Sequence, residues 1–203
     1  MFQPRAWLLF GIIAFSAGFR LIPYILQYFG TDVNPSSAWY PWSFSPVSAM
    51  FLFGGSHVLN RKAAVLLPLL ALLVSDVLIG VLMGDMSFGL HEFLPAVYGC
   101  YALMGCAGIW LRRHMNIANV ALTALLAEVV FFIVTNFAQW KLGDTYSHDM
   151  AGLWLCYDMA LPFVKNAFCG TALYTSLFFG GWALLERRVG AVQPAGSLVP
   201  SAE

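Results

Sequence analysis

Long apolar segments separated by short polar connections are the main pattern of this chain. A helix needs about 20 apolar residues to cross a bilayer, and the chain lacks the alternating segments of about ten residues that form membrane β-barrels. The pattern therefore predicts an all-α integral membrane protein, a single bundle of six transmembrane helices within residues 1–188. The six apolar segments lie at residues 6–29, 44–59, 63–83, 91–111, 117–140 and 157–185.

Two of these segments differ from a standard membrane span. The segment 44–59 is short for a membrane span and includes Ser, Pro and the pair Gly54-Gly55. This composition predicts a helix packed against other helices rather than facing lipid. The segment 157–185 is longer than a membrane span requires, and Pro162 predicts a bend near its start. After Arg188 the chain is rich in Gly, Ala, Pro and Ser, which predicts a disordered cytoplasmic tail over residues 189–203.

Basic residues gather at one set of segment ends, whereas the opposite connections contain only Lys141. Because cytoplasmic connections of membrane proteins carry the excess of Lys and Arg, this distribution predicts that both termini are cytoplasmic. A signal peptide cleaved near Ala17 is the alternative for the first segment, although Arg20 and Tyr24 continue its helical pattern. The basic residues at the predicted cytoplasmic ends are Arg5, Arg61, Lys62, Arg112, Arg113, Arg187 and Arg188.

The composition agrees with a membrane protein and excludes several classes of function. Charged residues make up 10% of the chain, against about 25% in a typical soluble domain. The net charge is zero without a run of Lys or Arg, so no nucleic-acid partner is predicted. The four cysteines have no CxxC spacing, and neither a metal nor a cofactor is predicted. No HExxH, GxSxG, Walker A or GxGxxG motif occurs, so the chain is not predicted to be an enzyme.

Charged side chains inside or at the rim of the apolar segments are the strongest indication of function. A charge at the bilayer centre costs roughly 2.5–3.5 kcal/mol, and such residues usually face a bundle interior or a water-filled cavity. The predicted orientation places four of them toward the outer side and one near mid-membrane, which predicts a polar pocket open to the outside. The alternative is that the charges only pair with one another. The residues are Arg20, Asp76, Glu128, Asp158 and Lys165.

Aromatic residues are concentrated in the predicted outer connections. Trp39, Trp42, Tyr146 and Trp154 are predicted to form a lid over a ring-containing ligand, and an interfacial aromatic belt is the alternative. Amide and imidazole side chains at similar depth complete the predicted pocket. The predicted substrate-binding residues are Arg20, Trp39, Trp42, Asp76, His91, Glu128, Asn136, Trp154, Asp158, Lys165 and Asn166.

Small residues of the first segment predict a surface on which another helix docks. Gly11, Ala14 and Gly18 include the small-xxx-small spacing Ala14–Gly18, which lets two membrane helices approach closely. The chain has no ATP-binding motif, so a transporter of this sequence would need a partner, an ion gradient or passive release.

Several motifs carry a resemblance to a known family. They are Arg20-Leu21-Ile22-Pro23, Phe44-Ser45-Pro46-Val47-Ser48-Ala49, Phe53-Gly54-Gly55, Pro68 through Ser75-Asp76, Phe131-Phe132-Ile133-Val134-Thr135-Asn136-Phe137, Gly152-Leu153 and Ala160-Leu161-Pro162-Phe163. With these motifs the chain resembles an uncharacterised family of bacterial membrane proteins. That family is similar to the substrate-binding S components of energy-coupling factor (ECF) vitamin transporters, and the resemblance covers residues 20–180.

The resemblance implies six helices in the bacterial cytoplasmic (inner) membrane and capture of cargo from outside. It also implies an energy-coupling transmembrane subunit with ATPases as a partner, or a solitary mode. Solitary cobalamin transporters of this group have a similar size and are associated with a cysteine ligand for cobalt near the outward end of the third segment. Residues 75–80 of this chain contain no cysteine, which puts thiolate-ligated cobalamin in doubt.

The sequence therefore predicts a multi-pass protein of the lipid bilayer that binds a small vitamin-like compound, cobalamin or another vitamin, for uptake. An intramembrane enzyme acting on a lipid or quinone-like substrate is one alternative. A membrane scaffold subunit, in which the charges only form structural pairs, is the other.

Overall fold

The computed structural model describes residues 4–33 and 41–189, which form helices joined by turns and loops. The all-α prediction is therefore confirmed for the described part of the chain. Residues 34–40, which include Trp39, and the predicted tail beyond Val189 lie outside the described residues. In chain order the helices are α1 (Pro4–Tyr28), α2 (Val47–His57), α3 (Arg61–Met83), the short 3₁₀ helix η2 (Met86–Phe88), α4 (Leu94–Leu111), α5 (Ile117–Leu142) and α6 (Met150–Val189).

Five of the described helices, α1, α3, α4, α5 and α6, are long and apolar enough to cross a membrane. They support the prediction of a multi-pass membrane protein. α2 has 11 residues and is about 16 Å long, roughly half the thickness of a hydrocarbon core. The predicted second segment therefore contains a helix too short to span a bilayer by itself.

α2 lies in the centre of the bundle. All of its residues from 47 to 56 are buried, and it packs against α1, α3, α4, α5 and α6. Met50, Phe51 and Leu52 of α2 join Leu72 of α3 and Met104 of α4 in the hydrophobic core. The prediction that this segment packs against other helices rather than facing lipid is confirmed.

Glycines bring α2 and α4 into backbone contact. A Cβ atom on Gly55 would collide with the carbonyl oxygen of Gly105 and lie 2.8 Å from the Cα atom of Gly108. A Cβ atom on Gly108 would collide in turn with the carbonyl oxygen of Leu52. Directly after α4, Arg112 Nε donates a hydrogen bond of 2.8 Å to the Gly55 carbonyl oxygen. The C-terminal half of α2 is therefore fixed against α4 by both steric fit and hydrogen bonding.

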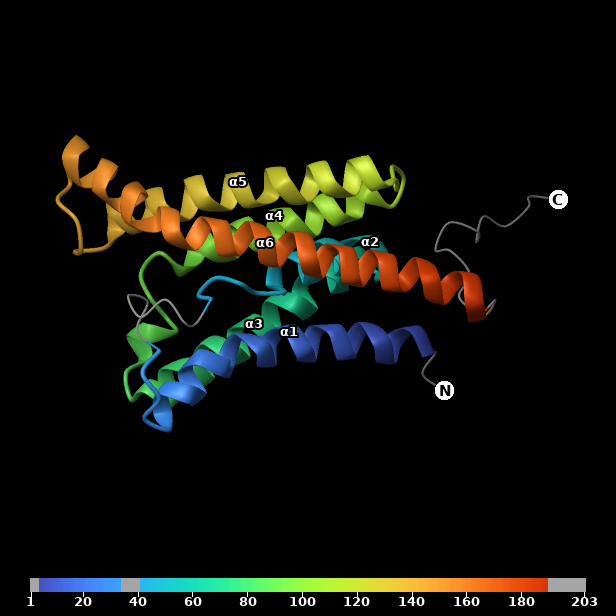
Figure 1. Cartoon of the computed structure of the whole chain (residues 1–203), viewed down its shortest axis with the longest axis horizontal. Coiled ribbons are helices and arrows are strands. Elements are labelled where there is room, and N and C mark those ends of the chain that lie inside the picture. Colours follow the sequence, from blue (N-terminus) through green and yellow to red (C-terminus); the bar gives the residue numbers. More distant parts are fainter. Residues whose placement is uncertain (1–3, 34–40, 190–203) are drawn as a thin grey trace.

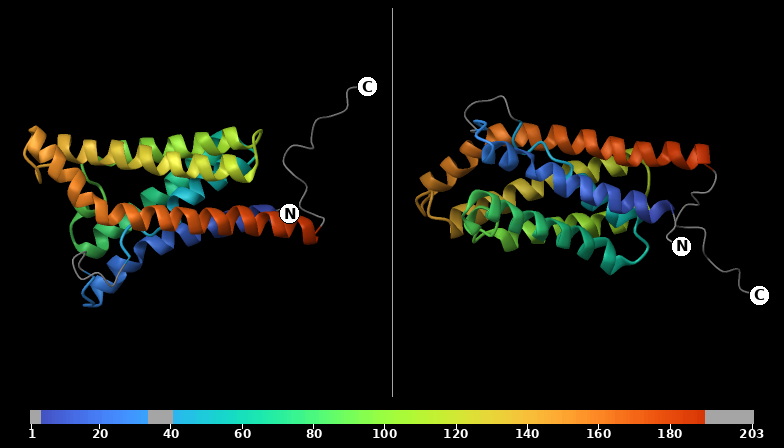
Figure 2. Two further views of the ribbon diagram at one scale, coloured as in Figure 1. Left: turned by 45° about the horizontal axis from the view of Figure 1, so that its top comes forward. Right: turned by 90° about the horizontal axis from the view of Figure 1, so that it is seen from below.

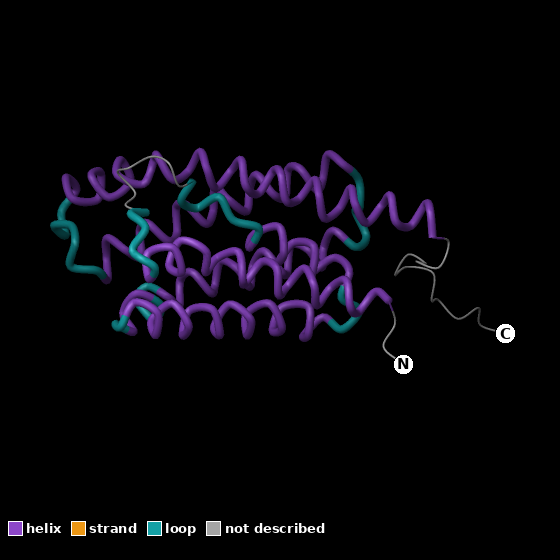
Figure 3. Tube along the Cα trace, turned by 60° about the horizontal axis from the view of Figure 1, so that its bottom comes forward, coloured by secondary structure: helices purple, strands orange, loops and turns teal. Residues whose placement is uncertain are grey.

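The helices run roughly along one axis and diverge at one end (Figure 1 and Figure 2). We call the end where α1 begins and α6 finishes the proximal end, and it also contains the turns at 58–60 and 112–116. The distal end contains the segments 29–33, 84–93 and 143–149. Toward the distal end α1 and α3 separate from α5 and α6, and the loop before α2 enters between the helices (Figure 3).

α6 is longer than the sequence predicted. It begins at Met150 rather than at residue 157, and its 40 residues extend over about 60 Å. The Asp149 carboxylate accepts a hydrogen bond of 2.7 Å from the Gly152 N–H and thereby caps the start of the helix. α6 bends within its N-terminal part, which contains Pro162 (Figure 2), in agreement with the predicted bend.

Candidate functional site

Two cavities lie in the distal half of the bundle. The α5–α6 cavity has a volume of about 260 Å³ and lies between those two helices. The α1 cavity, also about 260 Å³, lies between α1, the loop before α2, and α5 and α6. Four residues line both cavities, and they are Ser43, Glu128, Phe131 and Ala167. The two cavities therefore adjoin each other beside Glu128.

A larger and mostly apolar cavity of about 640 Å³ lies between α5 and α6 toward the proximal end. We call it the proximal cavity. Glu128, Phe168 and Thr171 form its distal boundary, and Glu186 lies near its other end. Glu128 thus borders all three cavities.

Glu128 is buried, with 4% of its surface exposed. The Thr171 hydroxyl donates a hydrogen bond of 2.6 Å to Glu128 Oε1, and the Ser48 hydroxyl also bonds to this carboxyl group. Within the described residues Glu128 forms no ion pair. Helices α2, α5 and α6 therefore hold one carboxyl group at the meeting point of the cavities, with hydroxyl groups as its only polar partners among these residues.

Helical periodicity places further polar groups of α5 in the α5–α6 cavity. Glu128, Thr135 and Gln139 stand at i, i+7 and i+11, which are positions on one helical face. All three line the cavity, so this face of α5 is turned toward it. Asn136 lines the cavity as well, and its Nδ2 donates a hydrogen bond of 2.8 Å to the carbonyl oxygen of Phe132.

Arg20 and Asp76 pair with each other. Arg20 Nη1 forms an ion pair with Asp76 Oδ1 and donates a hydrogen bond of 2.9 Å to Ser75 Oγ. The Tyr98 hydroxyl donates a hydrogen bond to Asp76 Oδ2. Asp76 is completely buried and lines neither distal cavity, whereas Arg20 is 26% exposed and lines the α1 cavity. For these two charges, the alternative of structural pairing applies, and Asp76 joins α1, α3 and α4.

One stripe of α6, at helical spacing and including Asp158 and Lys165, faces outward. Asp158, Pro162, Lys165 and Cys169 are all exposed, and none of them lines a distal cavity. The α6 residues that line the distal cavities are instead 156, 159, 160, 163, 164, 167, 168 and 171. Asn166 lies between these faces and donates a hydrogen bond of 3.0 Å to the carbonyl oxygen of Trp42.

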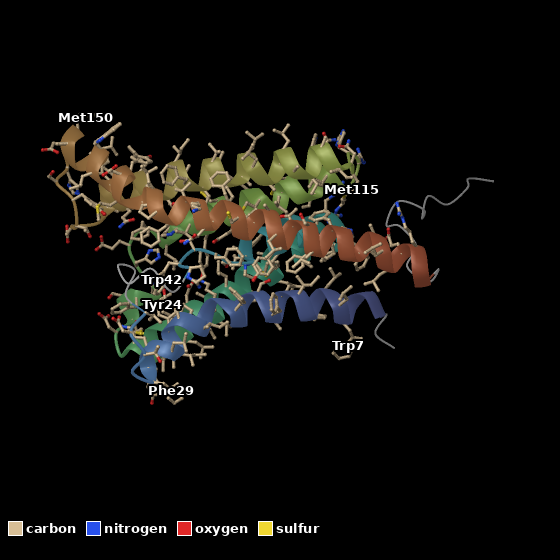
Figure 4. All side chains as sticks on the ribbon, in the orientation of Figure 1. Trp7, Tyr24, Phe29, Trp42, Met115 and Met150 are labelled. Carbon is tan, nitrogen blue, oxygen red and sulfur yellow. The ribbon has the colours of Figure 1, made fainter. Side chains whose placement is uncertain are left out.

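The predicted aromatic residues have different surroundings. Trp42 lines the α1 cavity and packs edge-on against Tyr24, with ring centroids 5.9 Å apart (Figure 4). Its indole N–H donates a hydrogen bond of 2.8 Å to the Val33 carbonyl oxygen. Tyr146 lines the α5–α6 cavity. Trp154 is 77% exposed and lines neither distal cavity. Trp42 and Tyr146 are therefore the described aromatic residues of the predicted lid that adjoin the cavities.

The other predicted site residues lie away from the distal cavities. His91 stacks on Phe93 with ring centroids 3.7 Å apart, and burial lowers its pKa. Its Nδ1 is buried without a hydrogen-bond partner among the described residues. Gly11, Ala14 and Gly18 are exposed on α1, and a Cβ atom on either glycine would meet nothing within 4 Å.

Sequence patterns missed several residues of the site. Thr171 and Ser48, which bond to Glu128, were not predicted, and neither were Tyr101 and Phe131 of the cavity walls. Thr171 and Thr175 stand four residues apart in an apolar segment, and this spacing would have indicated a polar face of α6. The aromatic wall residues have no such signal, because ordinary core residues have the same composition.

The arrangement is suited to holding a small molecule. One carboxyl group, several hydroxyl and amide groups and many aromatic rings surround the distal cavities, a combination typical of ligand pockets. Within the described residues no group of three His, Cys, Asp or Glu side chains could hold a metal ion.

Comparison with known proteins identifies a family. The model of a family of unknown function, DUF6580, matches residues 1–195. No curated protein and no solved structure matches the chain. The family match assigns no activity, so a function must be inferred from the site itself.

Proposed function

We propose that this chain, which belongs to the DUF6580 family of unknown function, is a membrane-embedded substrate-binding protein for uptake of a small vitamin-like compound. The observation that carries the proposal is the pair of distal cavities that adjoin each other beside Glu128. Polar groups inside a membrane bundle commonly mark the place where polar cargo binds. The resemblance to ECF S components supports the same function.

The proposed topology has both termini in the cytoplasm of a bacterial cell and the distal end outside. The basic residues Arg61 and Arg112 lie at the proximal end, as the positive-inside rule requires for a cytoplasmic end. α1 ends at the distal end and α3 begins at the proximal end, so the chain must return between them. The loop before α2 and α2 itself make that return, which supports six membrane-embedded helices. The distal cavities then receive cargo from outside.

The lipid bilayer and a coupling subunit are the proposed partners. Apolar side chains are exposed along all five long helices, as lipid contact requires. The bare surface at Gly11, Ala14 and Gly18 leaves room for a second helix to approach α1 closely. We assign this surface to the energy-coupling transmembrane subunit.

The proposal is tested by purifying the full chain in mild detergent and identifying retained small molecules by mass spectrometry, together with a binding screen against vitamins. We expect a bound compound. Ala167→Phe fills both distal cavities and should abolish its binding, whereas Ala118→Phe, at an exposed position of α5, should not. Thermal unfolding establishes that both variants fold. If no ligand is retained and no vitamin binds, the proposal is wrong, and conversion of a lipid or quinone would favour the enzyme alternative.

A further inference from the structure

The distal cavities contain one carboxyl group without a counter-charge among the described residues. Arg20 and Glu128 are the charged side chains that line these cavities. Arg20 is paired with the buried Asp76, so those two charges compensate each other. Lys165 of α6 is exposed and lines neither distal cavity. Glu128 therefore determines the charge that a ligand meets.

A buried carboxylate without a partner is unfavourable, and an approaching cation would stabilise its charged form. Ser48 and Thr171 provide neutral hydrogen bonds to Glu128 but no positive charge. Both distal cavities reach the Glu128 side chain, so a ligand in either one can place a group beside it. A cationic group there would form a charge-assisted hydrogen bond, which is stronger than a neutral one.

The walls of both cavities favour the same kind of group. Phe132, Phe163 and Phe168 line the α5–α6 cavity, while Tyr101 and Trp42 line the α1 cavity. The faces of aromatic rings attract ammonium groups, and they also provide contact area for an apolar ring. Among the described residues no unpaired basic group lines these cavities, so nothing there would offset the repulsion between Glu128 and a phosphate or carboxylate ligand.

We propose that the distal cavities bind a compact organic cation, an amine or quaternary ammonium attached to a ring, with its charge beside Glu128. This assignment rests on the proposed function, because it names the class of the captured compound. Cavities of about 260 Å³ each limit the ligand to a small molecule and exclude a whole phospholipid.

Three probes of similar size and different charge test the assignment. Binding of 2-phenylethylamine, 2-phenylethanol and phenylacetate to the full chain in detergent is measured by calorimetry. We expect the amine to bind at least about tenfold more tightly than the other two, the size of one charge-assisted hydrogen bond. Glu128→Gln should reduce amine affinity to that of the alcohol. Glu128→Asp, which keeps the charge, should retain the preference for the amine.

Glu186→Gln is the matched control. Glu186 borders the proximal cavity and neither distal cavity, and it accepts a hydrogen bond of 2.8 Å from Trp182 Nε1. The Glu186→Gln variant should therefore bind the amine with the same affinity as the wild-type chain. Thermal unfolding of each variant separates loss of binding from loss of folding. Equal affinity for the three probes, or unchanged amine affinity in Glu128→Gln, would refute the cation assignment. In that case a retained neutral or anionic compound would leave the proposed capture function intact. If no ligand is retained and neither vitamins nor probes bind, both proposals fail.

Discussion

Two buried carboxyl groups of this bundle have different surroundings. Asp76 is enclosed by Arg20, Ser75 and Tyr98, so the protein itself compensates its charge. Glu128 borders three cavities and receives hydrogen bonds from hydroxyl groups. We therefore expect a substitution at Asp76 to affect folding and a substitution at Glu128 to affect ligand binding.

Asp76→Leu leaves the Arg20 guanidinium without its partner. Breaking a buried ion pair from one side costs about 3–5 kcal/mol, and we expect the free energy of unfolding to fall by this amount. The double variant Arg20→Met/Asp76→Leu removes both charges and should recover much of the loss. Unfolding titrations in mixed detergent micelles measure both effects. An Asp76→Leu variant as stable as the unchanged chain would contradict the structural role of the pair.

The sequence predicted a set of charges within or at the rim of the apolar segments, but not which of them pair. Arg20 and Asp76 are both predicted to lie toward the outer side, and the structure brings them together. Their pairing depends on the rotation of α1 and on Tyr98 from α4, which are tertiary properties. The distinction between a structural and a ligand-binding charge is therefore invisible to composition and spacing.

At the scale of helices, the contact of α2 with α4 depends on the absence of side chains. Gly108→Ala places a methyl group against the Leu52 carbonyl oxygen, and we expect a loss of about 1–3 kcal/mol in stability through overpacking. Gly99→Ala, in the same helix, meets nothing within 4 Å and should gain up to about 1 kcal/mol through helix propensity. Equal unfolding free energies for the two variants would contradict the close approach.

The start of α6 should depend on pH. Hydrogen bonds from the Gly152 N–H and the Ser147 hydroxyl lower the pKa of Asp149 from its ordinary value of 3.8. A lowered pKa stabilises the folded cap above the ordinary value, and this contribution is lost as the pH falls through the folded-state pKa. We expect amide protection of residues 151–153 to decrease below about pH 4. Asp149→Ala should show low amide protection at both pH 6 and pH 3. Equal protection of the wild-type chain at these two pH values would contradict the role of Asp149 as a cap.

Apolar composition predicted where helices lie better than which faces they bury. The segment 117–140 corresponds closely to α5, because a long apolar run both forms a helix and enters a membrane. The start of α6 differs from the prediction because its cap, Asp149, lies in a polar stretch that apolar composition does not mark as helical. Asp158 and Lys165 share one face of α6, but packing of Phe163 and Phe168 toward the cavity turns that face outward. Apolar residues on several faces give too little contrast to predict that rotation.

At the scale of the whole molecule, the proposed direction of capture depends on which end faces the cytoplasm. The divergence of α1 and α3 from α5 and α6 and the two distal cavities occur at the same end. The basic residues Arg61 and Arg112 lie at the other end. Structure and charge therefore agree on a polarity for the molecule, and this polarity can be measured independently of any ligand.

Single cysteines in a chain without its native cysteines test the orientation. Ser87 of η2 is exposed at the distal end, and Met115 is exposed in the turn between α4 and α5 at the proximal end. We expect a membrane-impermeant maleimide to label Ser87→Cys in intact bacterial cells and Met115→Cys only after the membrane is permeabilised, since basic connections stay in the cytoplasm. Replacing all four cysteines by alanine gives the unlabelled control. Labelling of both positions from one side would rule out a membrane-crossing path between them, and the reverse pattern would place the distal cavities in the cytoplasm and turn capture into export.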